Sequence, residues 1–369
     1  MNQYRDTNMF GFETFTFNCY TFIWSFDVSG MLLMISISKW GGVEPSIGYD
    51  TYWKFACERQ KVFWEKLKGC NSSLTNDEIL KQYKFTNPYR ACDRVSQFLI
   101  RDVIYSDTFT HEDTFLRVIL FKLFNKVETW KLLESKFGVI SVDTFDAKAF
   151  ACFLDEQMHK GIKIYSNAYM MASGCKEFNV TRKHQAHLLL VKKMLNEHLP
   201  MKVHNSESME EAYKLLLAYP MIGKFLAYQY VTDLNYSEIT DFSESEFTVP
   251  GPGAKDGIKK CFISTGNYTD SDIIKIMAER QEYEFERLGL EFYNLGGRKL
   301  QYIDTQNLFC ETDKYCRVAH PELSGVSGRQ KIKQKYRPTR EQIQFTFPPK
   351  WGINMESIYG SRQISGVCT

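Results

Sequence analysis

Residues 249–255 read Val-Pro-Gly-Pro-Gly-Ala-Lys, and they stand between two segments rich in apolar side chains. Two glycines separated by one residue favour a tight turn, because a residue without a Cβ adopts backbone conformations that other residues avoid. Their N–H groups can also approach a phosphate closely, and a helix that begins there adds the positive end of its dipole. A plain loop with Gly and Pro would fit the same residues. The helical patterns on both sides favour a hairpin that joins two helices.

Apolar residues recur at intervals of three and four over most of the chain after Tyr49, which predicts amphipathic helices. No long run shows the alternation expected of a strand. We therefore expect an all-α fold over residues 39–321, followed by a less regular, basic tail over residues 322–369. Pro220 is expected to divide one helical segment into two. The helical segments are 50–68, 92–105, 112–125, 147–159, 183–199, 208–231 and 271–288.

The first 38 residues lack this pattern. They include a stretch rich in apolar and hydroxyl side chains, but Asn18 and Asp27 interrupt it. A signal peptide needs a basic start and a cleavage site, and a membrane span needs about 20 consecutive apolar residues. Neither description fits. We therefore expect residues 1–38 to be a leader outside the fold, ahead of an internal start at Met31 or Met34, and the protein to be cytoplasmic without a membrane partner.

Charge is nearly balanced overall, with a net charge of +2, but one segment is strongly basic. Residues 329–340 (RQKIKQKYRPTR) hold six basic residues and no acidic one. Such a run attracts phosphate without reading sequence, although a solvated surface tail would have the same composition. The 10 cysteines and 7 histidines are irregularly spaced and contain no CxxC pair. We therefore expect reduced thiols, no metal site and no cofactor.

The hairpin carries a resemblance to a known group of proteins. Residues 249–255 resemble the hairpin of the helix-hairpin-helix DNA glycosylase superfamily, and Tyr302-Ile303-Asp304-Thr305-Gln306 resembles the superfamily segment that holds a catalytic aspartate. The resemblance implies that Asp304 is the catalytic carboxylate and that Lys255 occupies the position of the Schiff-base lysine. Asp304 follows Lys255 by 49 positions, a longer interval than in ordinary glycosylases. The DNA-binding residues implied by the hairpin are Gly251, Gly253, Lys255 and Lys259.

A narrower resemblance covers residues 49–321. NPYRACDRVSQFLI (87–100), GKFLAYQYVTDLNYS (223–237), the hairpin and IDTQNLFCETDKYCR (303–317) follow one another in an order similar to the alpha-glutamyl/putrescinyl thymine pyrophosphorylase family. These proteins are relatives of the helical domain fused to hydroxymethyl-deoxyuridine DNA kinases. No GxxxxGK[ST] pattern occurs, so we do not expect the kinase half of that fusion. The resemblance implies a base or substrate pocket lined by Asn87, Arg90, Arg94, Gln97, Gln229, Asp233, Gln306 and Asn307.

The same residues have structural interpretations. Arg90, Arg94 and Gln97 have helical spacing and are expected to lie on one side of a helix. An exposed charged face, or an Arg–Asp pair that locks helix packing, would suit the same spacing. Gln229 and Asp233 lie towards the end of an apolar helix, where a C-terminal cap would suit them. The residues alone leave these alternatives open.

The predicted function is a DNA glycosylase that excises a flipped, hypermodified pyrimidine from double-stranded DNA and leaves an abasic site, as a defence against phage. Asp304 would stabilise the cationic sugar in that reaction. One alternative is a transferase in which an amine displaces pyrophosphate from an activated thymine, with Asp304 orienting or deprotonating the amine. The second alternative is a non-catalytic DNA-binding module. No obligate protein partner is evident.

Overall fold

The computed structural model describes residues 42–69, 74–168, 171–338 and 344–354, and the backbone of four short strands nearer the N-terminus. The described residues are mostly helical, which confirms the expected all-α fold. The helices are α1 (Ile47–Leu67), α2 (Glu78–Gln82), α3 (Arg94–Phe98), α4 (His111–Phe124), α5 (Val127–Phe137), α6 (Ala147–His159), α7 (Lys183–Asn196), α8 (Leu199–His204), α9 (Met209–Leu217), α10 (Lys224–Leu234), α11 (Pro252–Cys261), α12 (Asp270–Arg287) and α13 (Tyr302–Ala319). Shorter turns are the 3-10 helices η1 (Arg90–Cys92) and η3 (Pro349–Trp351) and the π-helical η2 (Leu99–Ile104).

Several helix boundaries follow from local side chains. The Asp146 carboxylate accepts hydrogen bonds from the N–H groups of Lys148 and Ala149, so α6 begins where the sequence predicts. Thr269 and Asp272 form a capping box at the start of α12. The chain breaks between α9 and α10 around Pro220, as expected, because proline cannot donate the helical hydrogen bond.

Two small antiparallel sheets accompany the helices, although the sequence pattern did not predict strands. One contains β1 (Thr7–Asn8), β2 (Phe12–Phe17), β3 (Tyr20–Phe26) and β4 (Leu32–Ile35), and the other pairs β5 (Val43–Pro45) with β6 (Phe262–Thr265). Strands form through pairing with distant segments, which short-range alternation does not report. Met34 lies in β4, whereas Met31 lies outside the described residues, and the separate leader stays a prediction. Within the described residues, no helix combines the length and the apolar character needed to span a bilayer.

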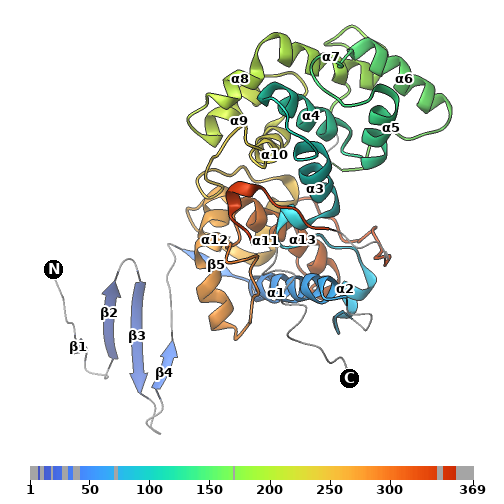
Figure 1. The fold of residues 1–369 in the computed structure, drawn as a ribbon. Coiled ribbons are helices and arrows are strands. Elements are labelled where there is room, and N and C mark those ends of the chain that lie inside the picture. The colour runs from blue at the N-terminus through green and yellow to red at the C-terminus, as the bar shows by residue number, and fades with distance from the viewer. Residues whose placement is uncertain are drawn as a thin grey trace.

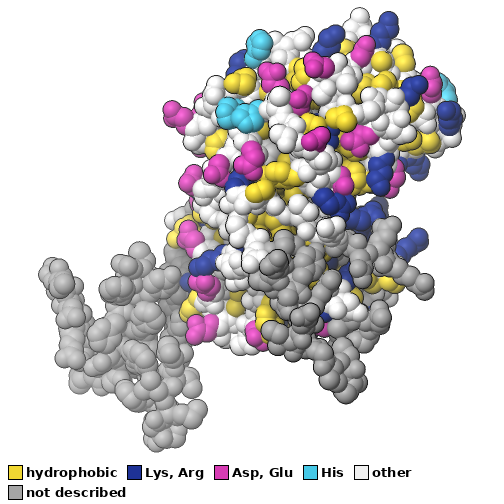
Figure 2. Space-filling view, viewed as in Figure 1, with side chains coloured by type: hydrophobic (Ala, Val, Ile, Leu, Met, Phe, Trp, Pro, Cys, Tyr) yellow, Lys and Arg dark blue, Asp and Glu magenta, His cyan; other side chains and the backbone are white. Residues whose placement is uncertain are grey.

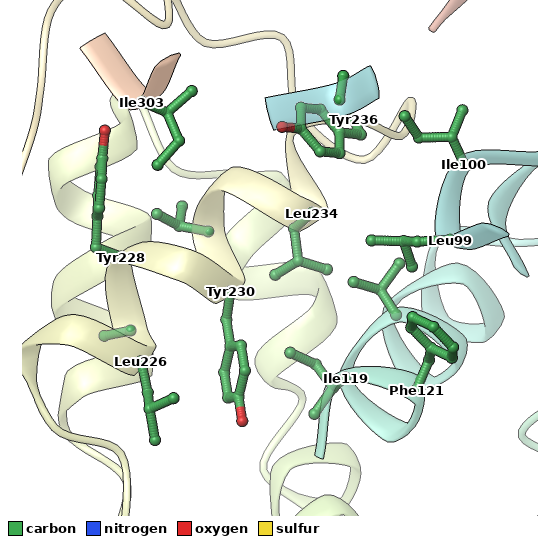
Figure 3. Close-up of a cluster of buried hydrophobic side chains, with 14 of the residues drawn as sticks. Leu99, Ile100, Ile119, Phe121, Leu226, Tyr228, Tyr230, Leu234, Tyr236 and Ile303 are labelled. Atoms are coloured by element: carbon green, nitrogen blue, oxygen red, sulfur yellow. The ribbon is translucent and has the colours of Figure 1, made fainter. Parts of the chain in front are cut away.

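The helices gather in two groups that meet near α10 (Figure 1). Helices α4 to α9 lie in one group, and α1, α11, α12 and α13 lie in the other. Every residue of α10 from Leu226 to Leu234 is buried. Figure 3 shows Tyr230 and Leu234 of α10 beside Ile119 and Phe121 of α4. Because α10 is enclosed by both groups, the polar side chains that it carries face the interior.

The expected tight turn at residues 249–255 is instead the start of α11, because α10 already ends at Leu234 and α11 begins at Pro252. Glycines at this helix start and within α11 allow close packing between helices. A Cβ on Gly257 would lie only 2.0 Å from the carbonyl oxygen of Phe309, so α11 and α13 touch through their backbones. A Cβ on Gly251 would lie 2.7 Å from the Phe225 ring. The Gly251 N–H donates to the Gln306 side-chain oxygen at 3.0 Å. The hairpin is therefore fixed to α13 by contacts within the protein.

The basic tail is docked on the helical body over its described part. The Asp256 carboxylate accepts hydrogen bonds from the backbone and hydroxyl of Ser327. Further along, the N–H of Tyr336 donates to the Gln82 carbonyl at 3.0 Å, at the end of α2. The basic side chains from Arg329 to Arg337 are nevertheless exposed, while Arg340 lies outside the described residues. The backbone is therefore held while the charges face solvent.

Candidate functional site

Arg90 is the centre of a buried polar cluster between the two groups of helices. Its side chain donates to Asp233 at 2.8 Å, to the Tyr236 hydroxyl at 3.0 Å and to Gln229 at 3.2 Å. Arg90 is 3% exposed and Asp233 is fully buried. A buried charge requires such partners because water no longer solvates it. The structure therefore brings together three of the residues predicted for the pocket.

Asp233 has a second cationic partner in Lys122 of α4. The Lys122 ammonium lies 3.2 Å from one Asp233 oxygen, and Arg90 holds the other. Burial opposes ionisation of Asp233, but the two cations outweigh it and hold the pKa of the carboxyl below its ordinary value. Lys122 also donates to the Asn125 side chain at 3.0 Å. The cluster thus connects η1, α10 and α4 through one carboxylate.

Asp304 caps the start of α13 and touches the same cluster from the other side. One carboxylate oxygen accepts the Arg90 backbone N–H at 2.7 Å, and the other accepts the Gln301 N–H at 3.0 Å. The residue is 4% exposed. Burial raises the pKa of Asp304 to about 6, although both hydrogen bonds favour the charged form. The predicted catalytic carboxylate is therefore a buried helix cap in this conformation.

Glu244 and Arg298 form a second ion pair next to Asp304. The Arg298 guanidinium donates to Glu244 at 2.8 Å, and both charges act on the Asp304 carboxyl. Burial raises the pKa of Glu244, and Arg298 opposes that shift. The same guanidinium stacks on the ring of Trp351, with its central carbon 3.8 Å from the ring centroid. Sequence patterns did not select these residues, nor Lys122 and Tyr236. Lys122 had a usable signal, because it is one of two cations, with Arg117, within the apolar run of α4.

The remaining predicted pocket residues separate into different roles. Gln97 is buried, and its amide bonds to the Ala91 carbonyl at 2.7 Å and to both backbone groups of Thr346. Arg94 is exposed, so the expectation that it shares one side with Arg90 and Gln97 is wrong. The reason is local: a 3-10 turn ends at Cys92 before α3 begins, so helical spacing does not carry through.

Two other predicted residues join α13 to the segment before η1. The Asn307 amide donates to the Asn87 carbonyl at 3.0 Å, and the Asn87 amide donates to the Cys92 carbonyl at 2.8 Å. Gln306 holds the hairpin through Gly251, as described above. These three amides therefore satisfy backbone groups in this conformation.

The lysines of α11 differ sharply in exposure. The side chain of Lys255 is 51% exposed and its ammonium lies 4.0 Å from Asp270. Lys259 is also exposed. Lys260, by contrast, is buried and pairs with Asp313 of α13 at 3.0 Å. Lys255 and Lys259 are therefore available to an outside anion, and Lys260 is not.

Electrostatic character varies over the surface. On the face shown in Figure 2, basic side chains gather towards the right edge and acidic ones towards the left.

A separate cleft of about 610 Å³ lies beside α1, with Glu58, Lys61, Tyr315 and His320 among its lining residues. No group of three His, Cys, Asp or Glu side chains suited to a metal occurs among the described residues. The cysteines within those residues are free thiols.

These features define a mostly helical protein with a buried polar cluster between two groups of helices. Sequence comparison identifies its family. The chain belongs to the family of the helical domain of 5-hmdU DNA kinase, whose profile matches residues 46–325. The 5-hmdU DNA kinase of Bacillus phage SP10 is 27% identical over 288 residues, which cover 72% of this chain and 44% of the relative. The chain thus matches less than half the length of that kinase. No solved structure matches it.

The comparisons correct the predicted reaction. The family and the phage relative are both named for a DNA kinase, so the prediction of a DNA glycosylase is wrong, and so is the transferase that displaces pyrophosphate. The proposed excision of phage bases depended on the glycosylase and falls with it. A glycine-rich helix start and a capping aspartate can serve helix packing alone, as Gly251 and Asp304 show, so they do not define which bond is broken. The relationship to the kinase helical domain is confirmed.

Proposed function

We propose that this chain engages DNA containing 5-hydroxymethyl-deoxyuridine, or a base derived from it, as the helical part of a base-phosphorylation system. The observation that carries the proposal is the family match over residues 46–325, which includes the Arg90 cluster, the hairpin and α13. The name of the phage relative supplies the substrate class. The start of α11 and the basic tail supply the groups that would contact DNA phosphates.

In this proposal the start of α11 and its two exposed lysines hold a DNA phosphate, as in a helix-hairpin-helix element. Lys255 N–H already bonds to the Gly251 carbonyl. Pro252 has no N–H, so Gly253 and Ala254 supply the first-turn donors that have no partner within the helix. An anion at this end also gains from the helix dipole. Lys255 and Lys259 add positive charge, which attracts phosphate whatever the DNA sequence.

The basic tail extends the same electrostatic attraction. Its exposed side chains from Arg329 to Arg337 stand on a backbone bonded to α2 and α11. A strip whose backbone is already ordered loses less conformational freedom when it binds than a free tail does. We propose that it contacts duplex flanking the modified base.

Phosphoryl transfer also requires a cradle for the nucleotide phosphates. The printed sequence contains no GxxxxGK[ST] pattern. We therefore assign nucleotide binding to a separate phosphotransferase domain and the presentation of the modified base to this chain. Arg90, Asp304 and Gln229 then shape and support the region that receives the base.

The test is equilibrium binding of the full chain to two duplexes that differ only in one 5-hydroxymethyl-deoxyuridine or thymidine. We expect tighter binding of the modified duplex by about tenfold, which corresponds to about 1.4 kcal/mol. Lys255→Ala with Lys259→Ala should weaken both duplexes equally, because phosphate contacts do not read the base. Lys192→Ala with Lys202→Ala, at exposed positions of α7 and α8, is the matched control because it removes the same charge. Equal affinity for both duplexes would contradict the base specificity, and phosphate transfer from ATP by the chain alone would contradict the division of labour.

A further inference from the structure

The C-terminal segment 344–354, here called the strap, places an aromatic ring at the junction of the two groups of helices. Its η3 turn lies there in Figure 1. The Trp351 ring stacks on the Arg298 guanidinium at 3.8 Å and meets the Tyr236 ring edge-on, with centroids 5.6 Å apart. Tyr236 in turn accepts a hydrogen bond from Arg90. The indole therefore stands next to the buried cluster that the family match includes.

The strap itself lies outside the matched residues 46–325. Polar contacts join it to several parts of the helical body, and the first of them is the Arg101 guanidinium, which donates to the Gln344 carbonyl at 3.2 Å. The backbone of Thr346 bonds to the Gln97 amide, and the Lys350 ammonium donates to the carbonyls of Ser237 and Thr240. Within η3, Lys350 also lies 3.8 Å from Asp241, and the Trp351 ring contacts the Phe347 and Tyr236 rings and the Arg298 guanidinium. Phe347 is part of the hydrophobic core, but Trp351 is only half-buried and lies beyond it in the strap, so η3 can withdraw while Phe347 stays in place.

Arg298 is better suited to a polar ring than to an indole. Its Nε is buried and meets no acceptor among the described residues. A buried donor without an acceptor is destabilising, so a ring that brings a carbonyl oxygen would remove a penalty that Trp351 leaves in place. Guanidinium planes stack on nucleobases as well as on indoles. Glu244, already paired with Arg298, adds an acceptor for a ring N–H.

From these contacts we propose that the place beside Arg298, Glu244 and Tyr236 is a binding site for a pyrimidine ring with carbonyl groups. Trp351 occupies this site as an intramolecular stand-in. DNA binding displaces the η3 turn of the strap, and a base turned out of the helix replaces the indole. The inference rests on the proposed function for the identity of the DNA base, and it names the residues that receive that base.

The first part of the test measures whether Trp351 competes with DNA for the ring site. Trp351→Ala should bind the 5-hydroxymethyl-deoxyuridine duplex about tenfold more tightly than the wild type, because the cost of displacing the indole is gone. Arg298→Lys keeps a charge for Glu244 but lacks the planar stack and Nε, so it should lose the preference for the modified duplex. Circular dichroism and thermal melting verify that each variant is folded. Unchanged or weaker binding by a folded Trp351→Ala protein would overturn the proposal.

The second arm uses no DNA. Added 5-hydroxymethyl-2′-deoxyuridine should raise the melting temperature of Trp351→Ala, and this rise should disappear when Arg298→Lys is combined with it. Indole serves as the comparison ligand. If Trp351 only fills space, indole will stabilise the variant and the nucleoside will not, which refutes the ring site even when modified DNA binds. If the nucleoside binds but neither duplex does, the ring site stands and the proposed DNA function fails.

Discussion

Arg90 and Asp233 lie 143 positions apart in the chain, yet their side chains form an ion pair of 2.8 Å with almost no exposure to solvent. Lys122 completes the arrangement from α4. A buried carboxylate with two cationic partners keeps its charge. Removal of any one of the three charges leaves buried charge without a counter-ion. The cluster thereby makes the relative placement of η1, α10 and α4 sensitive to single substitutions.

Asp233→Asn is expected to destabilise the protein by about 3–5 kcal/mol, because it leaves the buried charges of Arg90 and Lys122 without their shared counter-ion. Urea denaturation measures this change. Glu210→Gln is the control, since its pair with Lys214 is exposed and should contribute less than about 1 kcal/mol. A free energy of unfolding equal to the wild type in Asp233→Asn would show that the cluster does not support the fold.

The pKa of Asp304 predicts a pH dependence of stability. Burial raises it from 3.8 to about 6, so between these values the native state holds a proton that the unfolded chain has released. The free energy of unfolding should therefore fall as pH rises from about 4 to about 6, by up to about 3 kcal/mol. Asp304→Asn cannot titrate and should show a smaller fall over this range. A carboxyl NMR titration of Asp304 with a midpoint near 4 would contradict the prediction.

Asp233 predicts the opposite dependence at lower pH. Arg90 and Lys122 hold its pKa below the ordinary value, so its contribution is present above the unfolded pKa of 3.8 and disappears as pH falls through the native pKa. Unfolding experiments below pH 4 should show a loss of stability in the wild type. Asp233→Asn should not show the part of this loss that comes from Asp233. If the two proteins lose the same stability as the pH falls, the prediction is wrong.

Gly257→Ala should disrupt the contact between α11 and α13, since the added Cβ would lie 2.0 Å from a backbone oxygen that cannot rotate away. We expect a loss of at least about 1–3 kcal/mol, the usual cost of overpacking. Gly253→Ala is the matched comparison in the same helix. Its Cβ meets the Cys310 sulfur at 2.9 Å, and a side chain can shift more easily than backbone. Thermal melting should rank Gly257→Ala well below Gly253→Ala, and the reverse order would contradict this packing.

Neutralising the tail should reduce the salt dependence of DNA binding. Replacing Lys331, Lys333, Lys335 and Arg337 with Gln removes up to four phosphate contacts, each contributing about 0.9 to the slope of log affinity against log salt. The preference for a modified base should not change. Replacing Lys148, Lys160, Lys192 and Lys202 removes equal charge from exposed positions of the other helical group. Equal slopes in these two variants would assign the effect to net charge rather than to the tail.

The sequence by itself determined the local elements of this protein. Residues 147–159 form α6 as predicted and Pro220 separates α9 from α10, but residues 249–255 are the start of α11 and not a tight turn between two helices. Caps, proline and helical periodicity act over a few residues, so their effects are visible without knowledge of the fold. The same kind of reasoning missed the strands, whose hydrogen bonds depend on distant partners.

The tertiary structure decided which polar residues belong together. Arg90, Gln229 and Asp233 were predicted for one pocket and do meet, but the packing added Lys122 and Tyr236, and it placed Arg94 in solvent. Glu244, Arg298 and Trp351 come together from three separate segments that no sequence motif links. Electrostatic and stacking energies depend on distance and burial, and these are fixed only when the helices pack.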